Sequence, residues 1–417
     1  DALYILQYSV KLINKFPASE TKPNPEPGHG FDPNPGPEME PDLENMIRVT
    51  DSPYNAKGDG VTNDREAIQA AIDAAHTAGG GTVGLTAGKT FVTTNLVMRS
   101  NVILYFEDGA MLKQSNNPEE YVVPLPDGTY EPAEIIFGHD VVEAEWRHST
   151  FYNYPFIYAG EGTKNITITG NGIIELTRES SCDDTIHMVT IGLYKVNHYE
   201  LSGFTVRQFN GYITLASNCS NGLYKDLVSR EPADGNGDGI SLNNCQNIRV
   251  TGCDLVTSDD GIYVVSTYGD PRDGTWFDFD EPQPTQNIEI DHNKSELTWD
   301  ETKSFALMMW GNNYPDSQQV EASNIYVHDN HFETIGAWTG NWNIETGRFD
   351  FNGKVNAMKN IRFENNEIGF IQSNWSALQV SDFYGFDSMA AMQNGDFESG
   401  DLFWISRAGG SSGVEEK

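Results

Sequence analysis

The chain has few basic residues for its length. Its 417 residues include 26 Lys and Arg against 61 Asp and Glu, so the formal net charge is -35 and the pI is about 4.4. Nucleic acids and anionic membrane surfaces attract cationic proteins, so this charge argues against both as general partners. It would also repel a polyanionic substrate unless the binding cleft supplies its own cations.

Cysteine is scarce, and long apolar runs are absent. The four cysteines, Cys182, Cys219, Cys245 and Cys253, do not fit the CxxC spacing of a metal site. Cys219 and Cys245 occupy matching places in SNCSN and NNCQN, so we expect buried free thiols that stack in a repeat rather than a disulfide. No apolar run is long enough to span a membrane, and the first residues do not form a signal peptide.

The two ends differ in composition from the middle. Residues 1–16 form an amphipathic helix pattern that resembles the helix of a dockerin repeat, with a plain helix as the alternative. Residues 17–46 are rich in Pro, Glu and Gly, which predicts an extended linker. Residues 391–417 contain NGDFESGDL and resemble the start of a carbohydrate-binding module, with a disordered tail as the alternative. The resemblance of the ends implies secretion and binding to a cohesin.

Residues 47–390 are expected to form one domain, an all-β right-handed parallel β-helix with an N-terminal capping α-helix. Asn63 or Asp64 can cap a helix that runs to about Thr77. After it, an Asn followed by alternating apolar residues recurs, as in NITITG at 165, NIRVTG at 247 and NIYVHD at 324. Period-2 alternation repeated without helices predicts a solenoid of parallel strands. An antiparallel sandwich is the alternative.

Two further features of this solenoid can be expected. The repeated Asn residues should stack from coil to coil and bond the neighbouring backbone through their side-chain amides. Long intervals between repeats predict inserts at about 113–158 and 267–285, and inserts in a solenoid usually build the walls of a cleft.

Two acidic motifs mark the candidate site. Asp238 lies in NGDGI, and Asp259 and Asp260 lie in SDDGI, with Asp259 21 residues after Asp238. If one coil holds roughly that many residues, the three carboxylates lie on neighbouring coils about 4.8 Å apart. Repulsion would raise at least one pKa, so one carboxyl could act as a general acid while another activates water. Hydrolysis of a glycosidic bond needs this division.

Two other interpretations of the acidic motifs remain. Asp-Gly pairs are common in surface turns without any function. The letters DGNGDG also match the start of an EF-hand loop, but its twelfth position is Cys245 rather than Glu, and strands follow. A calcium site of another type in the acidic cluster is the remaining alternative, so no cofactor is required but calcium could bind.

Several motifs resemble family 28 glycoside hydrolases. GDGVTNDREAIQAAIDAA with GGGTV is similar to the cap of that family, and NGDGIS and SDDGIYV resemble its N-T-D and G-D-D motifs at the same spacing. The resemblance implies a secreted inverting hydrolase of pectin or polygalacturonan, which would act as a monomer on its polysaccharide partner. It implies Asp259 as the general acid and Asp238 with Asp260 as the groups that activate water. It also implies that Asn236 orients the cluster.

Two departures from the family affect the expected substrate. The family has a G-H-G motif one coil later, where this chain has 304–306, SFA. It also has an R-x-K motif that binds the uronate carboxylate, and this chain has 337–339, AWT, in that place. The residues Trp310, Trp338 and Trp342 could instead stack on a neutral sugar, although core packing is the alternative role for each. Arg207 and Arg230 would favour a uronate if they converge on the aspartates.

Other functions therefore stay open. A related β-helix group that cleaves neutral α-glucans, the dextranases and isopullulanase, also uses three aspartates without the His and Arg-Lys motifs. A calcium-dependent polysaccharide lyase would need a Lys or Arg base, which neither aspartate motif contains. A non-catalytic β-helix that binds glycans is the third alternative.

Overall fold

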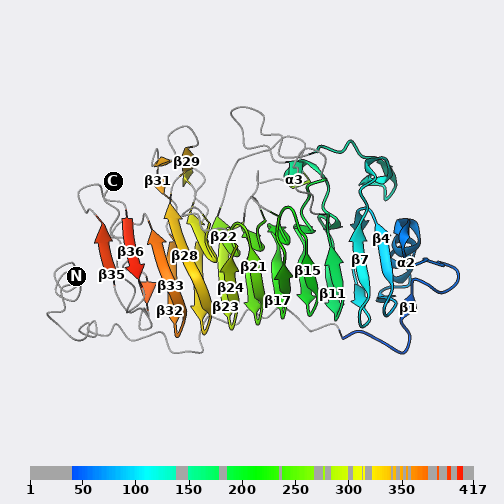
Figure 1. Ribbon diagram of the computed structural model, residues 1–417, viewed down its shortest axis with the longest axis horizontal. Helices are drawn as coiled ribbons and strands as arrows, with labels where there is room; N and C mark the ends of the chain where they lie inside the picture. The colour runs from blue at the N-terminus through cyan, green and yellow to red at the C-terminus, as the bar shows by residue number, and fades with distance from the viewer. Residues whose placement is uncertain are drawn as a thin grey trace.

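The chain forms a right-handed parallel β-helix with one α-helix over its N-terminal end (Figure 1). The computed structural model describes residues 40–137, 149–177, 186–233, 237–266, 276–277, 283–298, 304–311, 313–314, 322–339, 341–343, 348–350, 354–355, 358–373, 383–384, 392–395 and 402–406. Strands of successive coils pair in parallel along the length of the molecule, so the predicted solenoid is confirmed and the sandwich is excluded.

Each central coil contributes one strand to each of three parallel ladders. The first ladder is an 11-stranded sheet of β1 (Ile47–Arg48), β3 (Gly81–Leu85), β6 (Val102–Phe106), β11 (Lys164–Gly170), β14 (Asn197–Ser202), β17 (Ser220–Lys225), β20 (Gln246–Thr251), β23 (Thr285–Asp291), β27 (Ala322–His328), β32 (Met358–Glu364) and β34 (Phe383–Tyr384).

The other two ladders are joined in a 19-stranded sheet. The second ladder contains β2 (Asp59–Asn63), β4 (Thr90–Thr93), β7 (Met111–Gln114), β12 (Ile173–Glu175), β15 (Thr205–Arg207), β18 (Val228–Arg230), β21 (Asp254–Thr257), β24 (Lys294–Leu297) and the start of β28 (His331–Thr339). The third contains β5 (Leu96–Val97), β10 (Ile157–Ala159), β13 (Ile191–Tyr194), β16 (Thr214–Ser217), β19 (Ile240–Asn243), β22 (Ile262–Ser266), β25 (Leu307–Gly311) and the end of β28. The same sheet continues through β33 (Glu367–Ser373), β36 (Leu402–Ser406) and β35 (Met392–Gly395).

Several short elements are not part of these ladders. They are the antiparallel pairs β8 (Val122–Pro124) with β9 (Tyr130–Pro132), β26 (Asn313–Tyr314) with β31 (Lys354–Val355) and β29 (Asn341–Asn343) with β30 (Arg348–Asp350), and the helices η1 (Pro118–Glu120) and α3 (Ser149–Tyr152). Among the described residues, no helix is long and apolar enough to cross a membrane.

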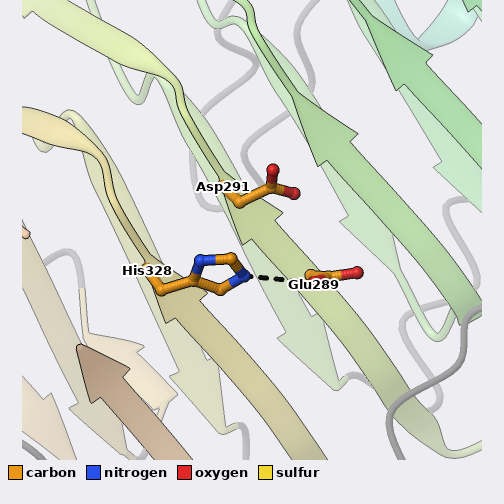
Figure 2. Close-up of side chains that lie close together, drawn as sticks. All are labelled: Glu289, Asp291 and His328. Carbon is orange, nitrogen blue, oxygen red and sulfur yellow. Dashed lines mark hydrogen bonds and ion pairs between the residues drawn. The ribbon is translucent and has the colours of Figure 1, made fainter. Parts of the chain in front are cut away.

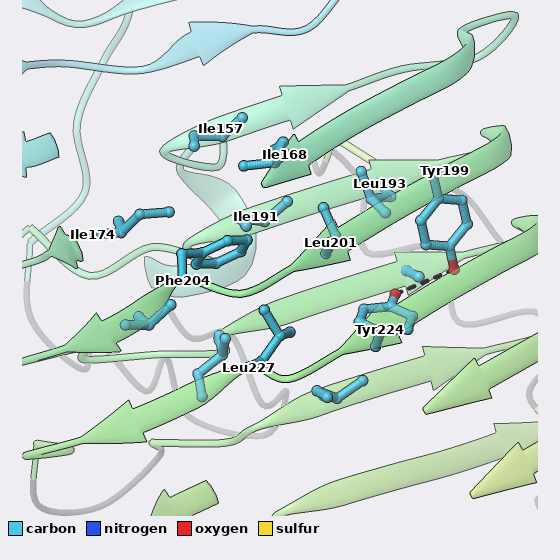
Figure 3. Close-up of a cluster of buried hydrophobic side chains, with 14 of the residues drawn as sticks. Ile157, Ile168, Ile174, Ile191, Leu193, Tyr199, Leu201, Phe204, Tyr224 and Leu227 are labelled. Atoms are coloured by element: carbon cyan, nitrogen blue, oxygen red, sulfur yellow. Dashed lines mark hydrogen bonds between the residues drawn. The ribbon is translucent and has the colours of Figure 1, made fainter. Parts of the chain in front are cut away.

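The core fills the inside of the coil, because every second residue of each strand points inward. Parallel register places Ile168, Leu201 and Tyr224 in one inward column across β11, β14 and β17 (Figure 3). Apolar contacts continue between such columns along the solenoid. The hydroxyls of Tyr199 and Tyr224 meet at 3.2 Å inside this core, so each buried phenol has a polar partner.

The cysteines belong to the same interior. Cys219, Cys245 and Cys253 are buried free thiols, as the sequence predicted. Cys219 and Cys245 precede strands β17 and β20, which pair in register, so the two thiols stack on neighbouring coils. Cys182 lies outside the described residues.

The capping helix α2 (Arg65–Thr77) follows the prediction closely. Asp64 is its N-cap residue, and the helix buries Ile68, Ala71 and Ile72 against β1, β3, β5 and β6. Its apolar side thereby covers the first coil, whose strand edges would otherwise be open (Figure 1). The Asp64 carboxylate does not cap α2 with its side chain, because it accepts the N–H groups of Lys57 and Gly58 instead.

The repeated Asn residues form a ladder at the start of the first-ladder strands. Their side-chain amides donate to side-chain oxygens on the preceding coil at 2.7 to 3.1 Å, from Asn165 to Asn101 and, in a second run, from Asn221 to Asn197, Asn247 to Asn221, Asn287 to Asn247 and Asn324 to Asn287. The prediction of stacking is confirmed, but the expected bonds to backbone are wrong for these residues. Six ladder members have positive φ, from 54 to 65 degrees, at Asn101, Asn165, Asn221, Asn247, Asn287 and Asn324. Asn tolerates that left-handed conformation better than most residues, which explains its recurrence.

A second, buried ladder does bond the backbone. Asn293, Asn330 and Asn366 lie on successive coils, and their amides donate to the carbonyls of Val250, Ile290 and Val327. Their side-chain oxygens accept the backbone N–H groups of the preceding coil at 2.9 to 3.0 Å. These residues satisfy backbone groups at turns inside the solenoid, where water does not reach.

The ends predicted as separate modules have different outcomes. Residues 1–16 and most of 17–46 lie outside the described residues. In the tail, β36 pairs antiparallel with β33 and β35, so the described part of 391–417 extends the 19-stranded sheet. The dockerin and the carbohydrate-binding module stay predictions.

Candidate active site

The three aspartates meet at turns between the second and third ladders. Asp238 precedes β19, while Asp259 and Asp260 lie between β21 and β22 on the next coil. One carboxylate oxygen of each residue lies within 4.8 Å of the others. Backbone bonds hold the two turns together, because Gly239 N–H donates to the Asp260 carbonyl at 2.8 Å.

Both carboxylates of the adjacent pair can face the same point because the pair lies outside the strands. Alternation in a regular strand would direct Asp259 and Asp260 to opposite sides. The turn between β21 and β22 removes that constraint. Glycines let the turns approach: a Cβ added at Gly239 would lie 1.9 Å from the carbonyl oxygen of Gly261, and one at Gly261 would lie 2.0 Å from Ser295 Oγ.

The site is acidic and largely closed to water. Asp238 is only 4% exposed, and the other two aspartates are half-buried. Burial, followed by the charges of Asp259 and Asp260, raises the pKa of Asp238 well above its usual value. Burial and the charge of Asp259 do the same to the pKa of Asp260. The three groups are therefore not all ionised near neutral pH.

The pKa of Asp259 is raised as well. Burial raises its pKa to about 6, against hydrogen bonds from Ser304 and the Asp260 backbone that lower it. The Ser304 hydroxyl donates to Asp259 at 2.8 Å, and the Phe305 N–H donates to Asp260 at 2.9 Å. Within the described residues, one oxygen of Asp238, Oδ2, is buried without a hydrogen-bond partner.

Ser304 and the backbone of Phe305 belong to the candidate site, but they were not predicted from the sequence. The family comparison had marked 304–306 only as the place where a histidine is absent. The structure shows that this segment faces the aspartates, because β22 and β25 pair in register from Ile262 and Leu307. The available signal was the position itself, one coil after the Asp pair.

The predicted arginines lie on the strands that lead into the site. Arg207 ends β15, Arg230 ends β18, and the two are in register. Arg207 Nε bonds Glu175 at 2.7 Å, and Arg230 bonds the Asp254 carboxylate and two backbone carbonyls. Within the part of the chain that the structure describes, the two arginines thus do not bond the three aspartates, and their role in substrate binding stays a prediction.

The other predicted binding residues are Asn236 and three Trp residues. Asn236 lies outside the described residues. Trp310 on β25 and Trp338 on β28 are in register on neighbouring coils, and Trp342 lies on β29. Trp310 follows Phe305 by five residues, so its backbone is about 16 Å along the strand from the level of Asp260. The side chains of the three Trp residues lie outside what the structure describes, so their role in sugar binding stays a prediction.

Residues of both inserts build an aromatic wall on the coils before Asp238. Phe151 from the first insert and Trp276 with Phe277 from the second pack with Val189 and Leu215. Phe151 also lies against Tyr212, with ring centroids 5.4 Å apart. Because the next residue, Ile213, donates its N–H to the Asp238 carbonyl, this wall borders the acidic turns. That the inserts build the walls of a cleft stays a prediction.

A second group of side chains could hold a metal by its composition alone. Glu289, Asp291 and His328 lie on the outer face of β23 and β27, with ligand atoms within 4.8 Å (Figure 2). However, Arg249 bonds both oxygens of Asp291 at 2.9 and 3.0 Å. His328 bonds Glu289 at 3.1 Å and Asp329 at 2.8 Å, so both ring nitrogens already face carboxylates. This arrangement is an ion-pair network in which a metal would have to displace the arginine.

Comparisons with known proteins give short or partial matches, and no protein-family model matches the chain. Two proteins of Azotobacter vinelandii match short stretches: a mannuronan C5-epimerase at 38% identity over 125 residues (28% of this chain, 12% of that protein), and an alginate lyase at 52% over 58 residues (12% and 7%). An exo-poly-α-D-galacturonosidase of Dickeya chrysanthemi is 26% identical over 299 residues, covering 60% of this chain and 45% of that protein. The chain thus spans less than half the length of these curated relatives.

A solved structure supports the fold. The family 28 exopolygalacturonase of Yersinia enterocolitica superimposes with a TM-score of 0.52 at 18% identity, covering 79% of this chain and 66% of that one. This likeness agrees with the parallel β-helix seen here.

Proposed function

We propose that the chain is a glycoside hydrolase that cleaves a polysaccharide of the pectin or polygalacturonan type, or a related glycan. The observation that carries this proposal is the cluster of Asp238, Asp259 and Asp260, with carboxylate oxygens within 4.8 Å and raised pKa values. Such a cluster supplies a protonated and an ionised carboxyl together, as hydrolysis requires. The partial match to a galacturonosidase supports the same class.

The roles follow from the reaction. Asp259 gives its proton to the glycosidic oxygen as the bond to the anomeric carbon breaks. Asp238 and Asp260 hold a water molecule and accept its proton as the water oxygen bonds to that carbon. The pKa of Asp259 is raised to about 6, so the enzyme should be most active on the acid side of neutrality. Among the described residues, Ser304 and Phe305 hold the Asp pair in place.

Inversion at the anomeric carbon is part of the proposal and rests on the resemblance of the two aspartate motifs to family 28. Inverting enzymes attack the anomeric carbon directly with water, whereas retaining enzymes attack it first with a carboxylate. Proton NMR of the first product decides between them: the anomer opposite to the substrate linkage supports inversion, and the same anomer contradicts it.

Reducing-sugar release tests the proposed function. Polygalacturonate, rhamnogalacturonan, alginate, dextran, pullulan and α-1,3-glucan would each be incubated with wild type and Asp259→Asn. We expect release from one of them by wild type and a loss of at least about 100-fold in the variant, since a general acid contributes about 10²–10⁴-fold. Asp108→Asn is the control, because Asp108 is exposed on a turn far along the solenoid. No release from any glycan would favour a non-catalytic glycan-binding β-helix.

The panel also separates acidic from neutral substrates. The ion pairs that already occupy Arg207 and Arg230 favour a neutral α-glucan, as cleaved by dextranase-like enzymes. The partial matches to proteins that act on galacturonan and mannuronan favour a uronate polymer. Release from dextran or pullulan alone would establish the first substrate class, and release from polygalacturonate alone the second.

The match to an alginate lyase makes a lyase the second candidate. A calcium-dependent lyase would use the carboxylates to hold the ion and a Lys or Arg to remove a proton from the uronate. Among the described residues, the carboxylates of Asp259 and Asp260 accept hydrogen bonds from Ser304 and Phe305, and neither donor can act as that base. Activity that survives a chelator and gives saturated products supports hydrolysis. Loss of activity on chelation, with products that absorb in the ultraviolet, supports the lyase.

The cellular setting belongs to the same proposal. A polysaccharide hydrolase of this kind would act outside the cell as a monomer, and a dockerin at residues 1–16 would attach it to a cohesin. Mixing the protein with a cohesin panel and analysing the mixture by size-exclusion chromatography tests both points. Coelution supports the attachment, and a dimeric mass of the protein alone contradicts the monomer.

A further inference from the structure

The coil after the Asp pair carries a dipeptide that touches both of its carboxylates. Ser304 and Phe305 are separated from the start of β25 by Ala306 and are 4% and 2% exposed. The Ser304 Oγ lies 2.8 Å from Asp259 Oδ1, and the Phe305 nitrogen lies 2.9 Å from Asp260 Oδ1. Parallel pairing of β22 with β25 fixes this register, and Gly261 N–H donates to the Phe305 carbonyl at 2.7 Å.

The two contacts differ in chemical capacity. A backbone N–H can only donate, so the Phe305 contact favours the ionised form of Asp260. A serine hydroxyl can donate to a carboxylate or, after rotation, accept from a carboxylic acid. The Ser304 contact can therefore serve Asp259 in both protonation states. In the proposed reaction the general acid passes between these two states in every turnover.

We infer that Ser304 is a positioning residue for Asp259, which holds its carboxyl in both the acid and the carboxylate form. This inference rests on the proposed function and adds a residue to it. The neighbouring Ser258 shows what a structural serine does here: its hydroxyl bonds the Gly237 N–H and the Ala233 carbonyl, which are backbone groups. Ser304 instead bonds a side chain of the acidic cluster.

The first test measures the carboxyl of Asp259 directly and needs no substrate. Protein labelled with ¹³C at the Asp carboxyls would be titrated by NMR, and Asp259→Asn would assign the signal. In Ser304→Ala the pKa of Asp259 should rise by about one unit, because the carboxylate loses a charge-assisted donor. Ser304→Thr keeps the hydroxyl and should stay near the wild-type value. Ser295→Ala is the matched control, since Ser295 is buried on the same coil and its Oγ has no hydrogen-bond partner among the described residues.

The outcomes are distinct. A pKa of Asp259 that is the same in Ser304→Ala and wild type overturns the inference, and so does a Thr variant that behaves like Ala. If wild type cleaves a glycan, the alkaline limb of its kcat/KM profile should move upward by the same amount in Ser304→Ala, with little change in KM. An unmoved limb also overturns the inference. If wild type cleaves nothing, the proposed function fails, and the titration alone decides whether Ser304 positions Asp259.

Discussion

Ionisation of Asp259 opposes folding, because its carboxyl is harder to charge in the site than in water. Burial raises its pKa from 3.8 to about 6. A group whose pKa is higher in the folded than in the unfolded state stabilises the fold fully below the unfolded pKa. That stability is lost as pH rises through about 6, so at pH 8 the buried carboxylate destabilises the folded state. Functional sites are commonly destabilising in this way.

Asp259→Asn should therefore stabilise the protein at pH 8 while it removes activity. The shift of about two pKa units corresponds to about 3 kcal/mol, and we expect a gain of about 1–3 kcal/mol because the amide keeps an acceptor for Ser304. At pH 4 the gain should vanish. Urea unfolding at both pH values measures it, with Asp108→Asn as the exposed control. A variant less stable than wild type at pH 8 would show that the charge is compensated by contacts outside the cluster.

At the scale of single elements, the two Asn ladders differ in how much structure depends on them. Asn287 is half-buried near the start of β23, has φ of 57 degrees, and bonds Asn247 and Asn324 at 2.9 and 3.1 Å. Asn330 is 3% exposed and bonds the Ile290 carbonyl and the Asn293 N–H. Loss of a buried partner leaves polar groups without water, whereas loss in the outer ladder does not.

Asn330→Ala should lower the free energy of unfolding by about 3 kcal/mol, because several buried hydrogen bonds are lost at about 1 kcal/mol each. Asn287→Ala should cost about 1–2 kcal/mol, mainly from the left-handed backbone that alanine adopts poorly. Equilibrium denaturation of both variants gives the comparison. Equal losses would mean that the buried ladder adds nothing beyond the outer one.

The ion-pair network on β20, β23 and β27 should make stability depend on pH. Burial lowers the pKa of His328, but its hydrogen bonds to Glu289 and Asp329 outweigh this, so the pKa is raised. The imidazolium therefore stabilises the fold fully below its unfolded pKa of about 6.5, and this contribution is lost as pH rises through the folded value. His328→Gln should thus be less stable than wild type at pH 6, and the difference should shrink by pH 9. Thermal unfolding across that range measures the trend, and a constant difference would contradict it.

At the scale of the whole molecule, the features that could be predicted from the sequence are those that depend on a repeated pattern or on a short interval between residues. The alternating pattern and recurring Asn predicted the solenoid, and the 21 residues between Asp238 and Asp259 predicted their approach on neighbouring coils. The hydrogen bond from Ser304 to Asp259 could not be predicted from the sequence. The two residues are 45 positions apart, and the length of the insert between them does not show which residue of the next coil faces Asp259. For the same reason the sequence did not show that Arg207 pairs with Glu175, 32 positions away.

The net charge of -35 should make the substrate class visible in the salt dependence of binding. At about 10 mM salt the Debye length is about 30 Å, so the whole acidic solenoid repels a polyuronate, while at about 150 mM it is about 8 Å and only nearby charges act. If the substrate is a uronate polymer, its KM should fall as salt rises over this range. A neutral glucan should show no change, and it serves as the control for salt effects on the enzyme. A KM that rises with salt would mean that free cations line the cleft, because screening would then weaken an attraction rather than a repulsion.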